Sequence, residues 1–140
     1  MKRTANAHWN GNLKEGKGNI STQSTVLSQT QYSFNTRFAD GVGTNPEELL
    51  GAAHAGCFTM AVSAALAQSG FTAGDLDTKA IVELDMVALK IAGIKLELKA
   101  AKIEGVSEEQ FLTIANGAKE NCLISKALGG TPISLEVIYG

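Results

Sequence analysis

Two cysteines, Cys57 and Cys122, are the residues of this sequence whose type best suits chemistry. They are the only cysteines among 140 residues, too few for the disulfide framework of a small secreted domain. In a reducing compartment, a disulfide that does form is more often transient and catalytic than structural. The pair is therefore a candidate thiol redox couple. The alternative is that Cys57 is simply a small buried hydrophobic residue.

Reactivity at Cys57 would require a nearby positive charge. The reactive form of a cysteine is the thiolate, and burial inside a helix disfavours it by raising the pKa of the thiol. The sequence contains two arginines, Arg3 in an N-terminal segment expected to fray and Arg37 between two phenylalanines. Arg37 is the credible candidate cation, unless its side chain simply extends into solvent.

A buried Arg37 would need an anion, and Glu47 or Glu48 at the start of the following helix could supply it. Ten residues separate Glu47 from Cys57, which in a helix corresponds to about 15 Å along the axis. The two side chains cannot touch directly, so the long guanidinium arm or a mobile loop would have to connect them. Glu48 has the stronger explanation as a helix-start residue.

Other chemistries find little support. His54, Cys57, Cys122 and His8 could be imagined as metal ligands, but no Cys-x-x-Cys or His-x-x-x-His spacing occurs. His54 is better explained as a packed or hydrogen-bonded interior side chain. The 15 glycines are scattered rather than gathered in a phosphate-binding loop. With 12 basic and 14 acidic residues, a net charge of −2 does not favour nucleic acid as a partner.

A long uncharged helix is expected to carry Cys57. Asn45 can cap it, Pro46 suits its first position and Gly70 is placed as its C-terminal stop. No formally charged side chain occurs over residues 49–67, a length close to that of a membrane span. The stretch is rich in Ala and Gly and contains polar side chains, which favours a helix buried on nearly every side over a transmembrane one.

Strands are expected on both sides of this helix, because apolar and polar residues alternate there between turn residues. Ser107 and Gln110 have the spacing of a capping box at the start of a second helix, which reaches Cys122. A hairpin is expected to turn at Asn10-Gly11 and to return at Leu13. Further strands are expected over residues 18–24, 31–38, 80–88, 94–100 and 133–139. A turn at Gly93 would join residues 80–88 to 94–100, and a short turn is expected at residues 125–128. This order predicts a single α+β domain over residues 1–140 with antiparallel sheet.

Assembly and location follow from the same burial argument. One sheet in a chain this short would cover one side of the helix from Pro46 to Gln68 and leave the other side apolar. A homodimer would bury that side. No apolar signal segment follows Met1 to Thr4, so we expect a cytoplasmic protein without a membrane partner.

Residues 43–58, GTNPEELLGAAHAGCF, resemble the central motif of the OsmC/Ohr family, the osmotically inducible and organic hydroperoxide resistance proteins. The resemblance extends to residues 7–11, 34–38 and 122–128, and so covers essentially the whole chain. His54, where the Ohr branch typically has Tyr, makes the sequence more similar to the OsmC branch. The resemblance implies an OsmC-like fold, in which antiparallel sheets wrap central helices in an intertwined homodimer.

The resemblance also implies a thiol-dependent peroxidase of oxidative and osmotic stress defence, which reduces organic hydroperoxides and, more weakly, hydrogen peroxide. Cys57 would be the peroxidatic cysteine, Cys122 the resolving cysteine, Arg37 the residue that stabilises the thiolate, and Glu47 the carboxylate that holds Arg37. The site would lie at the dimer interface, with no bound cofactor or metal. An external dithiol, such as a protein-bound lipoyl group, would act as reductant.

An apolar pocket for the organic group is expected near Phe38, Phe58 and Met60, together with residues of the second subunit. Two positions depart from the family pattern. Leu123 follows Cys122 where family members commonly have Pro, which bears on the resolving step, and Gly56 precedes Cys57 where Ala is usual. The alternative functions are a non-catalytic ligand-binding or metal-binding stress protein on the same fold, and a structural stress protein with inert thiols.

Overall fold

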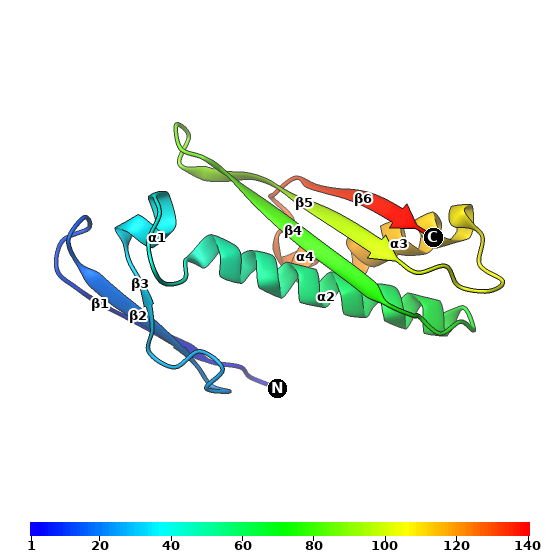
Figure 1. Cartoon of the computed structure of the whole chain (residues 1–140), viewed down its shortest axis with the longest axis horizontal. Coiled ribbons are helices and arrows are strands. Elements are labelled where there is room, and N and C mark those ends of the chain that lie inside the picture. The colour runs from blue at the N-terminus through cyan, green and yellow to red at the C-terminus, as the bar shows by residue number, and fades with distance from the viewer. The chain divides into compact units, whose positions relative to one another are not determined.

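The computed structural model describes residues 1–140 as two compact parts, Met1–Leu49 and Leu50–Gly140. The first part holds a three-stranded antiparallel sheet, a short helix and the first turn of the long helix α2 (Figure 1). Its elements are β1 (Ala5–Asn10), β2 (Lys17–Thr22), β3 (Thr30–Tyr32), α1 (Phe34–Phe38) and the start of α2 (Pro46–Gln68). Gly18 of β2 lies beneath the rings of Trp9 and Tyr32, where a Cβ atom would come within 2.6 Å of each ring. The two rings pack with centroids 5.4 Å apart over this position.

The expected N-terminal hairpin is confirmed, but its connection is longer than the Asn10-Gly11 turn predicted from the sequence. β1 ends at Asn10, and the return strand begins at Lys17 rather than at Leu13. Asn12 builds the intervening turn, because its side-chain oxygen accepts the amide of Glu15 and its carbonyl accepts the amide of Gly16. A local side-chain bond of this kind competes with strand pairing.

The strand predicted over residues 31–38 is wrong beyond Tyr32, because residues Phe34–Phe38 form helix α1. Ser33 caps this helix. Its hydroxyl accepts the amide of Thr36, and the hydroxyl of Thr36 accepts the amide of Ser33 in return. The reciprocal capping pair satisfies two backbone donors locally and so favours a helical turn over an extended strand.

The second part is a three-stranded sheet with two helices packed on one face (Figure 1). Its elements after α2 are β4 (Leu76–Asp85), β5 (Lys90–Ala100), α3 (Glu108–Asn121), α4 (Leu123–Ala127) and β6 (Ile133–Tyr139). β4 and β5 form the expected antiparallel hairpin, whereas β6 pairs parallel to β5. The α+β class is confirmed, but the expectation of purely antiparallel sheet is wrong here. The reason is the crossover through α3 and α4, which returns the chain to the end of the sheet where β5 began.

The turn of the β4–β5 hairpin does not lie at Gly93. It lies at residues 86–89, where the Asp85 carboxylate accepts hydrogen bonds from the amides of Val87 and Ala88. Leu89 adopts a left-handed conformation there, with φ of 51°. Gly93 instead lies within β5, where a Cβ atom would come within 3.2 Å of the carbonyl oxygen of Pro132. The glycine therefore serves a close approach of two chain segments rather than a turn.

The core of the second part lies between this sheet and the helices α2 and α3. β5 buries alternate residues, while Lys95, Glu97 and Lys99 point to the other face. α2 and α3 each contribute one apolar stripe at helical spacing. Ser107 and Gln110 form the capping box at the start of α3, as predicted from the sequence. The deeply buried members of the core include Phe58, Val62, Leu66, Ile94, Leu96, Leu98, Phe111 and Ala115.

The side of α2 away from the core is largely exposed. Past its first turn, the buried residues of α2 recur at helical spacing and form the opposite side, which faces the core: Gly51, His54, Phe58, Val62 and Leu66. Most residues between them are exposed. The sheet thus covers one side of this helix, as expected, whereas the prediction of a helix buried on nearly every side is wrong for the single chain. α2 is also the one helix whose length and composition would allow it to cross a membrane, with 28% of its most apolar stretch buried.

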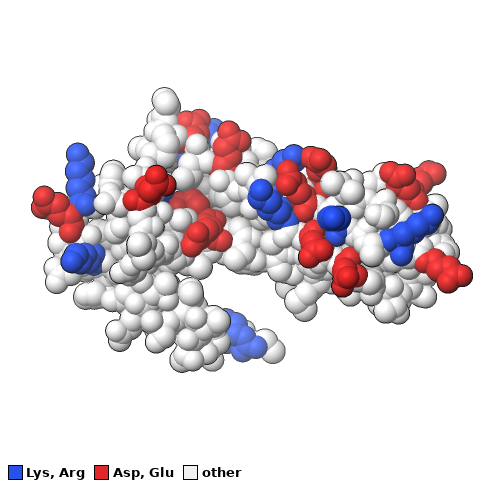
Figure 2. All heavy atoms as spheres, viewed as in Figure 1, with Lys and Arg blue, Asp and Glu red and all other residues white.

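The outer face of the β4–β5–β6 sheet is charged and mixed in sign. Lys95 forms ion pairs with Glu97 of its own strand and with Glu136 of β6, and these carboxylates raise the pKa of Lys95 to about 12. On the face shown in Figure 2, basic and acidic side chains alternate rather than gather by sign. Such a surface gives no single-sign field to attract a polyanion.

Candidate active site

The second part of the chain brings the two cysteines together. Cys57 lies in the interior of α2, and Cys122 lies where α3 ends and α4 begins. Their sulfur atoms are 2.7 Å apart although 65 residues separate them in sequence, and both thiols are free. Cys122 is 2% exposed, whereas Cys57 is only partly buried. The pair predicted from the sequence is thus in direct sulfur–sulfur contact, and the more accessible sulfur is that of Cys57.

Cys122 has an unusual position, because it caps two helices at once. Its backbone is extended, with φ of −57° and ψ of 130°, so α3 stops there and a new helix starts in another direction. The turn predicted over residues 125–128 is wrong in kind, since Leu123–Ala127 form the helix α4. Free amide groups in the first turn of a helix stabilise negative charge. The junction therefore places the Cys122 sulfur where a thiolate is favoured.

The two thiols titrate as a pair in which one proton is shared. Burial, and next the hydrogen bond with Cys122, raise the pKa of Cys57. Burial acts in the same upward sense on Cys122 but is outweighed by hydrogen bonds from Cys57, Ser125 and the amide of Ile124, which lower the pKa of Cys122. When one of the two thiols ionises, these shifts favour the negative charge on Cys122 and the proton on Cys57. Activation of Cys57 as a nucleophile therefore needs a cation, as expected from the sequence.

The first part of the chain holds the predicted arginine and its carboxylate. Arg37 of α1 donates from Nε and from one terminal nitrogen to Oε1 of Glu47, at 2.9 and 2.7 Å. Glu47 is buried with its side chain 10% exposed, and its other oxygen, Oε2, has no partner. The Arg37 side chain is 44% exposed and packs over the Phe38 ring. A guanidinium fixed at one edge by a buried carboxylate keeps its remaining donors free for a second anion.

The start of α2 explains why Glu47, and not Glu48, pairs with Arg37. Asn45 caps the helix by accepting the amide of Glu48, as predicted, and its own amide group donates to the carbonyl of Thr36 in α1. The Glu48 carboxylate accepts the hydroxyl of Thr44. Asn45 thus ties α1 to the first turn of α2, and this tie brings Glu47 to Arg37.

A second pair beside the cysteines was not anticipated from the sequence. His54, fully buried, lies 2.8 Å through Nε2 from the hydroxyl of Ser125, which is also buried. Nδ1 of His54 has no partner, and burial lowers the pKa of this imidazole, which keeps it neutral. His54 precedes Cys57 by three residues and Ser125 follows Cys122 by three. This matched helical spacing was the signal that could have revealed the pair.

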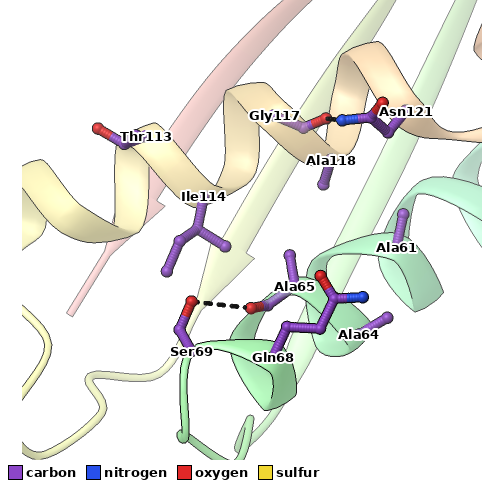
Figure 3. Close-up of a pocket in the computed structure, with 10 residues that line it drawn as sticks. All are labelled: Ala61, Ala64, Ala65, Gln68, Ser69, Thr113, Ile114, Gly117, Ala118 and Asn121. Carbon is purple, nitrogen blue, oxygen red and sulfur yellow. Dashed lines mark hydrogen bonds between the residues drawn. The ribbon is translucent and has the colours of Figure 1, made fainter.

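The side chains proposed from sequence to line a substrate pocket have different environments. Phe58 is fully buried in the core, Met60 is 75% exposed on the outer side of α2, and Phe38 is 37% exposed on α1. A hollow of about 480 Å³ lies instead between α2 and α3 (Figure 3). Ala61, four residues after Cys57, and Ala118, four residues before Cys122, lie on its facing walls, so the hollow extends along the same helix faces as the two cysteines.

The structure contains no cluster of three or more His, Cys, Asp or Glu side chains that could hold a metal ion. Of the four residues considered as ligands, His8 lies in β1 of the first part. His54 directs Nε2 to Ser125, and the two sulfur atoms face each other.

Comparison with known proteins identifies a family. Residues 39–137 match the family of OsmC-like proteins. The chain is 47% identical over 129 residues to the peroxiredoxin OsmC of Escherichia coli K12, a match that covers 91% of this chain and 90% of that protein. The peroxiredoxin OsmC of Shigella flexneri matches to the same extent.

Solved structures have the same fold. The organic hydroperoxide resistance protein OhrB of Bacillus subtilis superposes with a TM-score of 0.70 at 26% identity, covering 96% of this chain and 98% of that chain. An organic hydroperoxide resistance protein OsmC from Legionella pneumophila has a TM-score of 0.73 at 24% identity, covering 98% and 96%. The second likeness concerns the fold alone.

Proposed function

This chain belongs to the OsmC-like family, and from that membership we propose that it is a thiol-dependent peroxidase that reduces organic hydroperoxides through Cys57 and Cys122. The observation that carries the two-cysteine cycle is the 2.7 Å contact between the sulfur atoms. A non-catalytic stress protein with inert thiols would have no need of this contact, nor of a lowered pKa at one of its two sulfurs.

The proposed cycle has three steps. The Cys57 thiolate attacks the outer peroxide oxygen and forms a sulfenic acid, while the O–O bond breaks and the alkoxide leaves as an alcohol after taking up a proton from water. The Cys122 thiolate then attacks the sulfenic sulfur, the S–S bond forms, and hydroxide leaves and becomes water on protonation. An external dithiol, for which a lipoyl group is our candidate, reduces the disulfide and is itself oxidised. The cycle calls for no bound cofactor or metal.

In this proposal Arg37 stabilises the Cys57 thiolate, and Glu47 holds Arg37 in the orientation required. Support comes from the two hydrogen bonds that Glu47 accepts at a single carboxylate oxygen, because they fix one edge of the guanidinium. Support also comes from the raised pKa of Cys57, which requires a compensating cation.

The organic group of the peroxide is proposed to contact apolar surface around Phe38, Phe58 and Met60. Met60 and Phe38 offer exposed apolar surface, while Phe58 is buried and would act by shaping the wall from within the core. Apolar contacts of this kind would favour an alkyl hydroperoxide over hydrogen peroxide, because only the former has apolar area to bury.

We further propose a cytoplasmic homodimer whose two α2 helices pack against each other. The exposed side of α2 carries mostly small residues and Met60, which is 75% exposed. Small residues allow two helices to approach closely, and burial of this side would remove an apolar surface from water. Dimerisation thus accounts for a helix whose length and composition would otherwise allow it to cross a membrane.

Ala64→Lys is expected to shift the protein from dimer to monomer in sedimentation velocity, because it places a charge on the exposed side of α2. Ile138→Lys is the matched control, since Ile138 is 59% exposed on the outer face of the sheet, and we expect it to remain dimeric. A dimer that survives Ala64→Lys would contradict the proposed α2 interface.

The function itself is tested by mixing the reduced protein with cumene hydroperoxide and dihydrolipoamide, beside a parallel reaction with hydrogen peroxide. We expect faster consumption of the organic peroxide. Mass spectrometry of a sample quenched without reductant is expected to show a Cys57–Cys122 disulfide. No consumption, with both thiols still free after treatment, would contradict the enzyme and would favour a ligand-binding protein on the same fold.

A further inference from the structure

The pair formed by His54 and Ser125 lies beside the cysteines and has no part in the cycle described so far. His54 is 0% exposed and Ser125 is 8% exposed. Their side chains meet at 2.8 Å across 71 residues of sequence, joining α2 to α4. A buried polar pair of this kind costs free energy unless its hydrogen bonds are made, so its presence in an otherwise apolar core calls for an explanation.

The free nitrogen of His54 determines how the proton is arranged. The imidazole is neutral, so one ring nitrogen carries hydrogen and the other does not. Nδ1 is buried without a partner, and an orphaned buried N–H is rarer and costlier than an orphaned acceptor. The hydrogen therefore belongs on Nε2, which donates to the oxygen of Ser125. The hydroxyl hydrogen of Ser125 is then directed away from His54.

The Cys122 thiolate is the group that Ser125 stabilises. Both the hydroxyl and the backbone amide of Ser125 act on Cys122 and lower its pKa, together with Cys57 and the amide of Ile124. Ser125 is the third residue of α4, the helix that begins directly after Cys122. His54 thus contacts Ser125, which lies three residues after Cys122, and the Cys122 sulfur contacts that of Cys57.

We propose that His54 and Ser125 are positioning residues for the resolving step: His54 orients the Ser125 hydroxyl so that it donates to the Cys122 sulfur and keeps it ready to attack the Cys57 sulfenic acid. The inference rests on the proposed two-cysteine cycle and deepens it. Cys122 supplies the electron pair of the new S–S bond, the S–O bond at Cys57 breaks, and the released hydroxide takes a proton from solvent. Neither His54 nor Ser125 exchanges a bond in this step.

The arrangement also bears on Leu123, the residue that follows Cys122, because a leucine lacks the fixed φ with which a proline would stiffen this position. Here Leu123 is 75% exposed and contributes little packing. A hydrogen bond from His54 to Ser125, two residues further along α4, supplies an alternative restraint on the same junction.

The lifetime of the Cys57 sulfenic acid is the direct test, measured by dimedone trapping at timed intervals after one equivalent of cumene hydroperoxide. We expect Ser125→Ala to slow disulfide formation roughly tenfold, because it removes one hydrogen bond to a charged sulfur. Ser125→Thr keeps the hydroxyl and is expected to restore the rate. His54→Leu is expected to slow the step less, because the Ser125 hydroxyl is still present but no longer oriented.

A second readout separates this role from a merely structural one. In a Cys57→Ser background, thiolate absorbance gives the pKa of Cys122, and we expect that pKa to rise in Ser125→Ala. Thr59→Val is the matched control, since Thr59 lies on α2 and bonds Thr78 rather than a cysteine. It should leave both the resolving rate and the pKa of Cys122 unchanged.

The outcomes are distinguishable. If folded Ser125→Ala forms the disulfide at the wild-type rate, or leaves the pKa of Cys122 unchanged, the positioning role is overturned while the two-cysteine cycle stands. If the wild-type protein forms no Cys57–Cys122 disulfide after peroxide treatment, the cycle itself is overturned, and this inference with it.

Discussion

Cys57→Ser is expected to abolish the consumption of organic hydroperoxide, with a loss of about 10³-fold or more, the scale seen when an enzyme loses its nucleophile. A serine hydroxyl is far less acidic and less nucleophilic than a thiol, so it cannot replace the Cys57 sulfur as the nucleophile. Cys57 is partly exposed, which makes it the sulfur that a substrate can reach. The measurement is peroxide disappearance under saturating dithiol.

Cys122→Ser is the matched control for this experiment, because it removes the other sulfur of the same contact. It should consume one equivalent of peroxide and then accumulate the Cys57 sulfenic acid, which dimedone traps. The opposite pattern, with Cys122→Ser inert and Cys57→Ser active, would reverse the roles of the two cysteines. The lowered pKa of Cys122 makes this reversal the strongest competing assignment, and the single-turnover comparison decides between them.

Arg37→Ala is expected to slow the oxidation of Cys57 by about 10- to 1,000-fold at neutral pH, which corresponds to the loss of one opposite charge next to an ionising group. Burial already raises the pKa of Cys57. Removal of the cation would raise it further, so the thiolate fraction at pH 7 falls about tenfold for each pKa unit. The rate should recover as pH increases, and a stopped-flow profile of the first step against pH checks this sign.

The other arginine provides the control, since the sequence has only two. Arg3→Ala should react like the wild-type protein, because Arg3 bonds only the carbonyl of Lys2 and is exposed. Glu47→Gln tests the carboxylate separately: it keeps the shape but weakens the hold on Arg37, so an intermediate loss is expected. Wild-type kinetics in a folded Arg37→Ala protein would remove Arg37 from the mechanism.

The local elements were predictable where a short stretch of sequence contains its own signal. Asn45 and Pro46 mark the start of α2, and Ser107 with Gln110 marks the start of α3, because capping bonds join residues three apart. The fold class and the family followed from the order of elements and from residues 43–58. These features depend on neighbours in sequence, which a single chain displays directly.

The errors arise where distant residues decide the structure. Gly93 has turn chemistry, but the approach of Pro132 gives it a place inside β5. The direction of β6 depends on how α3 and α4 return the chain to the sheet, which alternation along residues 133–139 cannot show. Residues 34–38 alternate like a strand, yet the Ser33 capping pair makes them a helix.

The candidate site shows the same division. The pairing of Arg37 with Glu47 could be proposed because charge in an apolar setting needs a partner. The pairing of His54 with Ser125 was missed, because an apolar stretch with one histidine has no local signal for a partner 71 residues away. Only the equal offsets of three residues from the two cysteines indicate it.

In the proposed cycle, the contact between Cys57 and Cys122 also means that turnover would change the topology of the chain. Each oxidation would close a covalent ring that contains β4, β5 and α3, and each reduction would open it again. Closing a ring of 65 residues removes conformational freedom from the unfolded chain worth about 4 kcal/mol on the chain-entropy scale. In the proposed cycle the protein would therefore alternate between a reduced linear chain and a cross-linked oxidised chain, and the oxidised chain would be more stable against unfolding. The external reductant would always act on this more stable form.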